Sequence, residues 1–221
     1  MDLTVMLPTY NEELTIGRVI DEIRSLPIEC EILIGDGNSS DRTYSIAESM
    51  GVTPISIKER GKGNAIRRLI REVNTPYVIM VNADYTYPIK YAQLIFKLLS
   101  TEYYDVVIGC RLLKEKGSMS SANTLGNFLL SMLASILYRY RIYDVCSGMW
   151  GFKKEVLDKF NVTSGGFTLE ADFFSNSVKN KCKIIQIPIE YRARPDGSLA
   201  KLKVWDGFKI AWFLIKRRLI G

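Results

Sequence analysis

The chain has 221 residues, 47% of them hydrophobic, which is enough to bury the core of one compact domain. It contains no histidine, which excludes histidine-ligated metals and catalytic triads that use a histidine base. The net charge of +6 favours an anionic partner, such as a phosphorylated substrate or an anionic lipid surface. No recognition-helix or RNA-binding pattern accompanies that charge, so nucleic acid is not an expected partner.

The first half of the chain alternates short apolar runs with amphipathic segments, a pattern typical of βα units around a mostly parallel sheet. Strands are predicted over residues 3–7, 31–34, 53–57, 77–81 and 106–108. Helices are predicted over residues 12–25, 42–50, 64–73 and 91–99. We therefore expect a single α/β domain over residues 1–221 with a mostly parallel central sheet.

Two apolar segments dominate the second half of the chain. Residues 124–140 (TLGNFLLSMLASILYRY) are strongly apolar, and residues 205–220 (WDGFKIAWFLIKRRLI) combine aromatic residues with a basic end. Neither reaches the roughly 18 consecutive apolar residues that a spanning helix needs. We expect C-terminal interfacial amphipathic helices that lie on a membrane, although either segment alone fits a core helix equally well. The N-terminus lacks the features of a signal peptide, which predicts a cytoplasmic protein, peripheral at the inner face of the membrane.

Ligands of parallel sheets bind beyond the carboxyl ends of the strands, where this chain places three polar segments. They are PTYNE at residues 8–12, GDGNS at 35–39 and NADYT at 82–86. Asn82 and Asp84 follow a strand, so their oxygens are candidate ligands for Mg²⁺ or Mn²⁺ beside a nucleotide diphosphate. Such residues also form ordinary turns, and NAD alone is weak support for a metal site. Likewise, Asp36 in the second segment either accepts a hydrogen bond from the nucleobase or the ribose, or only stabilises a turn.

Three further segments carry charged or small residues at loop positions. Residues 61–64 (GKGN) precede a helix but lack the Walker A pattern. We therefore expect a structural turn that also contributes a contact to the donor substrate. Glu170 and Asp172 either cap a helix or belong to the acceptor and metal surroundings. One further segment contains Arg192, Arg194, Lys201 and Lys203. It is predicted to be either a solvated basic loop or a loop that closes over phosphates.

Eight motifs follow one another along nearly the whole chain. They are LPTYNE (7–12), DGNSSDRT (36–43), GKGNAIR (61–67), NADYTYP (82–88), IGCR (108–111), CSGMWGF (146–152), GFTLEADF (166–173) and RPDGSLAKL (194–202). In this order they resemble the family-2 glycosyltransferases of GT-A fold, and this resemblance implies a Rossmann-like three-layer sandwich. The resemblance is strongest to the branch of dolichol-phosphate mannose synthases and polyprenyl-phosphate glycosyltransferases.

The resemblance implies roles for particular residues. Asp84 and Asn82 would hold the cation against the diphosphate, and Ala83 between them would belong to the same binding segment. The family often has aspartate where this chain has Asn82, so we expect weaker cation binding or greater reliance on Asp84. The implied catalytic residues are Asp84, Arg111 and Glu170. The implied contacts with the nucleotide and the phosphates come from Pro8, Tyr10, Glu12, Asp36, Arg111, Arg194 and Lys201.

The resemblance also implies a reaction. A hexose, mannose or glucose, would pass with inversion from a GDP- or UDP-sugar to a polyprenyl (dolichyl) phosphate, which is ionised at neutral pH and needs no strong base. Residues 1–115 would bind the nucleotide sugar, and residues 116–221 would face the acceptor and a membrane, or a membrane-anchored partner subunit. Two alternatives stay open: transfer to a hydroxyl acceptor with Glu170 or Asp172 as base, and a non-catalytic nucleotide-sugar-binding protein.

Overall fold

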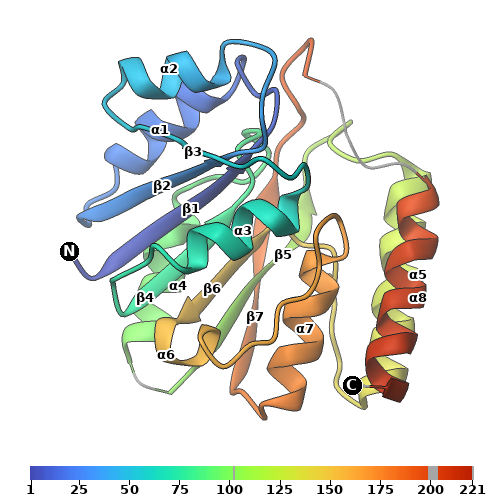
Figure 1. The fold of residues 1–221 in the computed structure, drawn as a ribbon. Coiled ribbons are helices and arrows are strands. Elements are labelled where there is room, and N and C mark those ends of the chain that lie inside the picture. The colour runs from blue at the N-terminus through green and yellow to red at the C-terminus, as the bar shows by residue number, and fades with distance from the viewer. Residues whose placement is uncertain (102, 199–203, 221) are drawn as a thin grey trace.

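A seven-stranded sheet forms the centre of the computed structural model, which describes residues 1–101, 103–198 and 204–220 (Figure 1). The strand order is β3-β2-β1-β4-β6-β5-β7. Strands β3, β2, β1 and β4 are parallel, as are β5 and β7, whereas β6 runs antiparallel to both neighbours. The strands are β1 (Leu3–Thr9), β2 (Cys30–Asp36), β3 (Ile55–Ser56), β4 (Tyr77–Val81), β5 (Val106–Lys114), β6 (Met149–Lys153) and β7 (Ile184–Tyr191).

Helices cover both faces of this sheet and complete three layers (Figure 1). One face packs against α1 (Ile16–Arg24), α2 (Thr43–Ser49) and α4 (Tyr91–Ser100). The other face packs against α3 (Lys62–Ile70), α5 (Ser121–Tyr138), α6 (Lys154–Leu157), α7 (Leu169–Lys179) and α8 (Val204–Ile220). The predicted α/β three-layer sandwich with a mostly parallel central sheet is confirmed.

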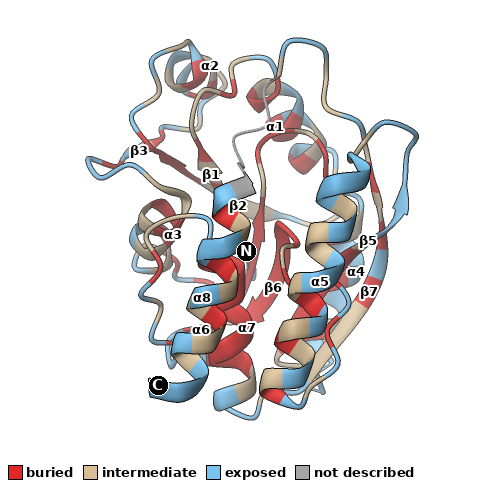
Figure 2. Ribbon diagram, turned by 90° about the vertical axis from the view of Figure 1, so that its right-hand side faces the viewer, coloured by how far each residue is buried: buried red, intermediate tan, exposed pale blue. Residues whose placement is uncertain are grey.

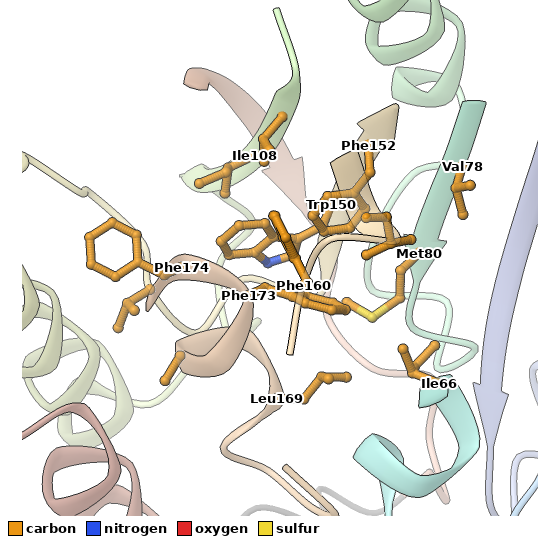
Figure 3. Packing of buried hydrophobic residues seen from close by; sticks show 14 of the residues in the cluster. Ile66, Val78, Met80, Ile108, Trp150, Phe152, Phe160, Leu169, Phe173 and Phe174 are labelled. Atoms are coloured by element: carbon orange, nitrogen blue, oxygen red, sulfur yellow. The ribbon is translucent and has the colours of Figure 1, made fainter. Parts of the chain in front are cut away.

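Two apolar cores follow from the alternation of side chains along the strands. In β1, Leu3, Val5 and Leu7 belong to the core under α1, whereas Met6 belongs to the core on the opposite face. The second core is rich in aromatic residues. In Figure 3, Trp150 and Phe152 of β6 meet Phe173 of α7, with ring centroids 5.8 and 4.8 Å from that of Phe173.

Strands β6 and β7 were not predicted from the sequence. The segment of β6 is only MWGFK and is buried on both sides, so it shows no alternation of polar and apolar residues. Strand β7 does alternate, with Ile187, Ile189 and Tyr191 buried, but Pro188 interrupts it. Proline is tolerated there because β7 lies at the edge of the sheet, next to β5 only.

Helix α1 begins four residues later than predicted, at Ile16. The residues before it form a turn in which Asn11 has a φ of 51° and the carbonyl of Glu12 accepts from the amides of Thr15 and Ile16. This turn lengthens the loop after β1. The loop therefore stays available at the edge of the sheet where ligands bind.

Helices α5 and α8 lie side by side on the outside of the second core (Figure 2). Ala134, Ile210 and Leu214 are buried, and the hydroxyl of Tyr138 donates to the carbonyl of Leu214 at 3.1 Å. Each helix thus contributes to the core through one side, as the core interpretation predicted. Much of the opposite side is exposed and apolar. None of the helices within the described residues is long and apolar enough to cross a membrane.

Candidate active site

The carboxyl ends of β1, β2 and β4 meet at one edge of the sheet. Pro8 lies opposite Gly35, and Thr9 lies opposite Asp36, in the parallel pairing of β1 with β2. Strand β4 is the other neighbour of β1, and Asn82 follows it directly. The three polar segments that the sequence indicated therefore come together, as expected for ligand sites in parallel sheets.

Asp36 is 3% exposed and closes a tight turn after β2. One carboxylate oxygen accepts from the Ser39 hydroxyl at 2.6 Å, and the other accepts from the Ser39 amide at 2.9 Å. Asn38 adopts a φ of 64° within this turn. The structure therefore has the turn aspartate that was one of the two predictions for Asp36, and contact with the nucleotide stays a prediction.

The loop after β1 is fastened to the loop after β2. The amide of Asn11 donates to the Ser39 hydroxyl at 2.9 Å, and the amide of Glu12 donates to the Thr43 hydroxyl at 2.7 Å. The guanidinium of Arg60 lies over the ring of Tyr10, 5.3 Å from its centroid. Tyr10 thus lies in the loop after β1 with its ring against Arg60, and contact with the nucleotide stays a prediction.

Asp84 is 3% exposed, and both of its carboxylate oxygens accept hydrogen bonds. Oδ1 accepts from the amide and the hydroxyl of Thr86, at 3.2 and 2.5 Å. Oδ2 accepts from Nη2 of Arg194 at 2.5 Å. The structure thus brings together Asp84 and Arg194, which lie 110 positions apart in the sequence.

Tyr85, between Asp84 and Thr86, has a φ of 64°, which is unusual for a bulky residue. The guanidinium of Arg192 lies 4.6 Å from the centroid of its ring and pairs with Glu22 at 2.7 Å. The amide of Arg192 also donates to the carbonyl of Thr86 at 2.9 Å. These contacts hold the strained turn that orients Asp84, and sequence reasoning did not find them.

Asn82 contacts Lys62, a residue that the sequence did not single out as a site residue. Nζ of Lys62 donates to Oδ1 of Asn82 at 2.6 Å and also pairs with the carboxylate of Glu170. A Cβ atom on Gly148 would lie only 2.4 Å from the Asn82 amide nitrogen, so a side chain at position 148 would displace Asn82. Lys62, Asn82 and Glu170 therefore form one polar cluster.

The glycines of the GKGN segment bring Lys62 to this cluster. Cβ atoms on Gly61 and Gly63 would lie 2.0 and 2.1 Å from the carbonyl oxygens of Gly165 and Ser164. The amide of Asn64 donates to the Gly165 carbonyl at 3.2 Å. The start of α3 therefore packs against the loop before α7. Residues 62–64 form the first turn of α3 and not a separate turn before it, so the predicted structural turn is wrong, and the Asn64 amide is not directed at a phosphate.

Asp172 is fully buried and anchors three segments. It accepts from the amides of Thr163 and Ser164 at 2.7 and 2.8 Å, and from Asn176 at 2.9 Å. Nη2 of Arg217 in α8 donates to the same carboxylate at 2.6 Å. Asp172 therefore has a structural role, and it is engaged by too many donors to act as a general base.

Arg111 is held by Asp144 in a buried ion pair. Its Nε and Nη2 donate to the two oxygens of Asp144 at 2.8 and 2.7 Å, and its amide donates as well. Burial alone would raise the pKa of Asp144, but the charge and hydrogen bonds of Arg111 lower that pKa below its ordinary value. The structure thus gives Arg111 a carboxylate partner, and a role in binding phosphate stays a prediction.

The residues present fit a divalent cation that is shared with a substrate. Asp84 offers a buried carboxylate oxygen whose partner is the cationic side chain of Arg194, and Asn82 offers a carbonyl oxygen that faces Lys62. Within the described residues no group of three or more acidic, cysteine or histidine side chains could hold a metal alone. Such a sparse donor set suits Mg²⁺ or Mn²⁺, which keep waters and bind substrate phosphates. Lys201 lies outside the described residues.

The fold and this edge of the sheet define a class of protein: an α/β protein whose polar residues gather beyond the carboxyl ends of its parallel strands, where such proteins bind their ligands. Residues 4–160 match the model of the glycosyl transferase family 2. The chain therefore belongs to that family and is a glycosyltransferase.

Named relatives and a solved structure agree with this family. Glycosyltransferase AglJ of Haloferax volcanii is 33% identical over 216 residues, which cover 96% of this chain and 71% of the relative. A dolichyl-phosphate hexose transferase of the same organism is 34% identical over 194 residues, or 87% and 84% of the two chains. Glucosyl-3-phosphoglycerate synthase from Mycobacterium tuberculosis, solved with Mn²⁺, UDP-glucose and phosphoglyceric acid, has a TM-score of 0.78. That likeness, at 20% identity, covers 99% of this chain and 80% of the other, and it confirms the GT-A fold.

Proposed function

We propose that this glycosyltransferase moves a hexose, mannose or glucose, from a GDP- or UDP-sugar to a polyprenyl phosphate, with inversion at the anomeric carbon. The observation that carries the choice of acceptor is the state of Glu170 and Asp172, the two carboxylates that were candidates for a general base. Glu170 is paired with Lys62, and the buried carboxylate of Asp172 accepts hydrogen bonds from four donor groups. A hydroxyl acceptor needs a base, whereas an ionised phosphate does not. The name of the dolichyl-phosphate hexose transferase supports the same acceptor.

The residues at the edge of the sheet divide the work of binding and alignment. Pro8, Tyr10, Glu12 and Asp36 bind the nucleoside, with the Tyr10 ring against the base. Asp84 and Asn82 would hold Mg²⁺ or Mn²⁺, which supplies positive charge against the departing diphosphate. Lys62 and Arg194 add positive charge beside the same two residues. Catalysis then depends on alignment of the two phosphorylated substrates and on charge stabilisation.

The exposed side of α5 and α8 is proposed to lie on a membrane surface. Its apolar side chains project from both helices, and Phe128 and Trp212 are 61% and 66% exposed. Lys209, Lys216 and Arg218 on α8 are exposed and suit anionic headgroups. A protein held there would meet a polyprenyl phosphate from the cytoplasmic side of the bilayer. A membrane-anchored partner subunit is the other occupant to be tested.

The proposed reaction is tested by incubating the protein with Mn²⁺ or Mg²⁺, a short polyprenyl phosphate and labelled GDP-mannose or UDP-glucose. Label in an organic-extractable product is expected from one donor. Asp84→Ala should lower this rate by about a hundredfold or more, because charge stabilisation by a metal contributes several kcal/mol. Asp158→Ala, at a half-exposed carboxylate in a surface ion pair, is the control, and thermal melting checks that both variants fold.

Full activity of Asp84→Ala would exclude the metal assignment. Donor binding without lipid product would favour a hydroxyl acceptor or a missing membrane partner. No donor binding at all would contradict the proposed reaction.

A further inference from the structure

Both side chains assigned to the metal ion already contact positive charges of the protein itself. Lys62 donates to Asn82, and its charge is also balanced by Glu170. Arg194 pairs with Asp84, whose carboxylate is only 5% exposed. A buried carboxylate is costly unless it is paired, so the guanidinium stabilises Asp84 in the metal-free protein.

Arg194 contacts the one oxygen of Asp84 whose hydrogen-bond partner lies outside the Asp84 turn. Oδ1 of Asp84 accepts from the Thr86 amide and hydroxyl, which belong to the same turn and move with it. Oδ2 accepts from Arg194, on a segment distant in sequence. A metal ion bound to Oδ2 at roughly 2.1 Å and a guanidinium on the same oxygen would repel each other strongly. The metal and Arg194 therefore compete for Oδ2.

The segment that carries Arg194 is anchored just before this residue. The amide of Arg192 donates to the Thr86 carbonyl, and its guanidinium stacks on Tyr85 and pairs with Glu22. Arg194 is two residues further on, before a turn in which the Ser198 amide donates to the Pro195 carbonyl. Arg194 can therefore leave Asp84 without loss of the contacts that orient the Asp84 turn.

We propose that Arg194 is an exchangeable counterion of Asp84. It neutralises this carboxylate while no metal is bound, and metal binding releases its guanidinium beside the site at which the diphosphate arrives. The inference rests on the metal site of the proposed function. It adds that the free protein disfavours the metal, and that metal binding and the availability of Arg194 for the donor are coupled.

The test is Mn²⁺ binding in the absence of nucleotide, measured by the electron paramagnetic resonance signal of free Mn²⁺. Arg194→Gln removes the competing charge and should bind Mn²⁺ on the order of tenfold more tightly than the wild type. Arg194→Lys, which keeps the charge, should lie between the two. Lys114→Gln removes the same charge at an exposed position and should leave binding unchanged. Equal or weaker binding by Arg194→Gln overturns the proposal, as does no binding by either protein.

Thermal melting gives a second readout that is independent of activity. Without metal, Arg194→Gln should melt below the wild type because Asp84 loses its partner. Saturating Mn²⁺ should raise the melting temperature of Arg194→Gln more than that of the wild type, because no ion pair has to be broken. An equal rise in both proteins would contradict the exchange.

The two proposals fail separately. Metal-dependent transfer by the wild type, with equal Mn²⁺ affinities for wild type and Arg194→Gln, would leave the reaction standing and exclude the exchange. Tighter Mn²⁺ binding by Arg194→Gln with no product from any donor would leave the exchange standing and contradict the reaction.

Discussion

At the residue scale, Glu170 distinguishes an acceptor that needs a base from one that does not. Its carboxylate is paired with Lys62, so we expect Glu170→Gln to lower the rate of transfer to polyprenyl phosphate by less than about tenfold. Donor affinity should change little, as measured by titration with the nucleotide sugar. The matched control is Glu190→Gln, which removes a carboxylate from an exposed pair with Lys90. A loss of about 10²-fold or more with intact donor binding would identify Glu170 as a general base.

Asp144 and Arg111 form a pair whose contribution to stability depends on pH. The folded state lowers the pKa of Asp144, so its stabilisation is complete at pH values above the ordinary aspartate pKa and is lost as pH falls through the lowered value. At pH 7, Asp144→Asn should lower the free energy of unfolding by about 3 kcal/mol, because Arg111 stays buried without its partner. Urea unfolding at pH 7 and in acid measures both values. A difference between variant and wild type that is constant with pH would contradict this role.

Some site residues could be predicted because their position in the chain fixes their position in space. Asn82 and Asp84 directly follow a strand of a parallel sheet, and that sheet edge is where ligands bind. Lys62 was missed because its partners, Asn82 and Glu170, lie 20 and 108 positions away. The glycines beside it gave a signal, but their role is close packing of backbone, which sequence alone does not separate from phosphate binding.

At the scale of secondary structure, Arg217 ties α8 to the loop before α7. Its guanidinium pairs with Asp172, which is 0% exposed, and also donates to the Asn161 carbonyl. Arg217→Ala should lower the free energy of unfolding by about 3 kcal/mol because it leaves a buried carboxylate with fewer donors. Hydrogen exchange should rise throughout α8, while Lys216→Ala, at an exposed neighbour, should change neither quantity. Unchanged protection of α8 in Arg217→Ala would show that the apolar contacts alone hold this helix.

The elements of the first half were predictable because each strand and helix there has its own periodicity. Strand β6 was not predictable in this way. It follows α5 in the chain but lies between β4 and β5 in the sheet, and this position depends on the tertiary fold. Helices α5 and α8 were placed correctly, but their sequences fit both core and membrane contact. The structure shows why: each helix has one side in the core and another that is apolar and exposed.

At the scale of the whole molecule, the exposed side of α5 and α8 predicts where the enzyme works. The double variant Phe208→Ser with Trp212→Ser should weaken binding to phosphatidylglycerol-containing vesicles by at least about tenfold, because burial of each aromatic side chain contributes at least 1.5 kcal/mol. Vesicle flotation measures this binding, and high salt should weaken it as well. Leu94→Ser, at an exposed apolar position of α4, is the control. Unchanged flotation would contradict membrane contact, and a stable dimer that the double variant dissociates would assign this side to a second subunit.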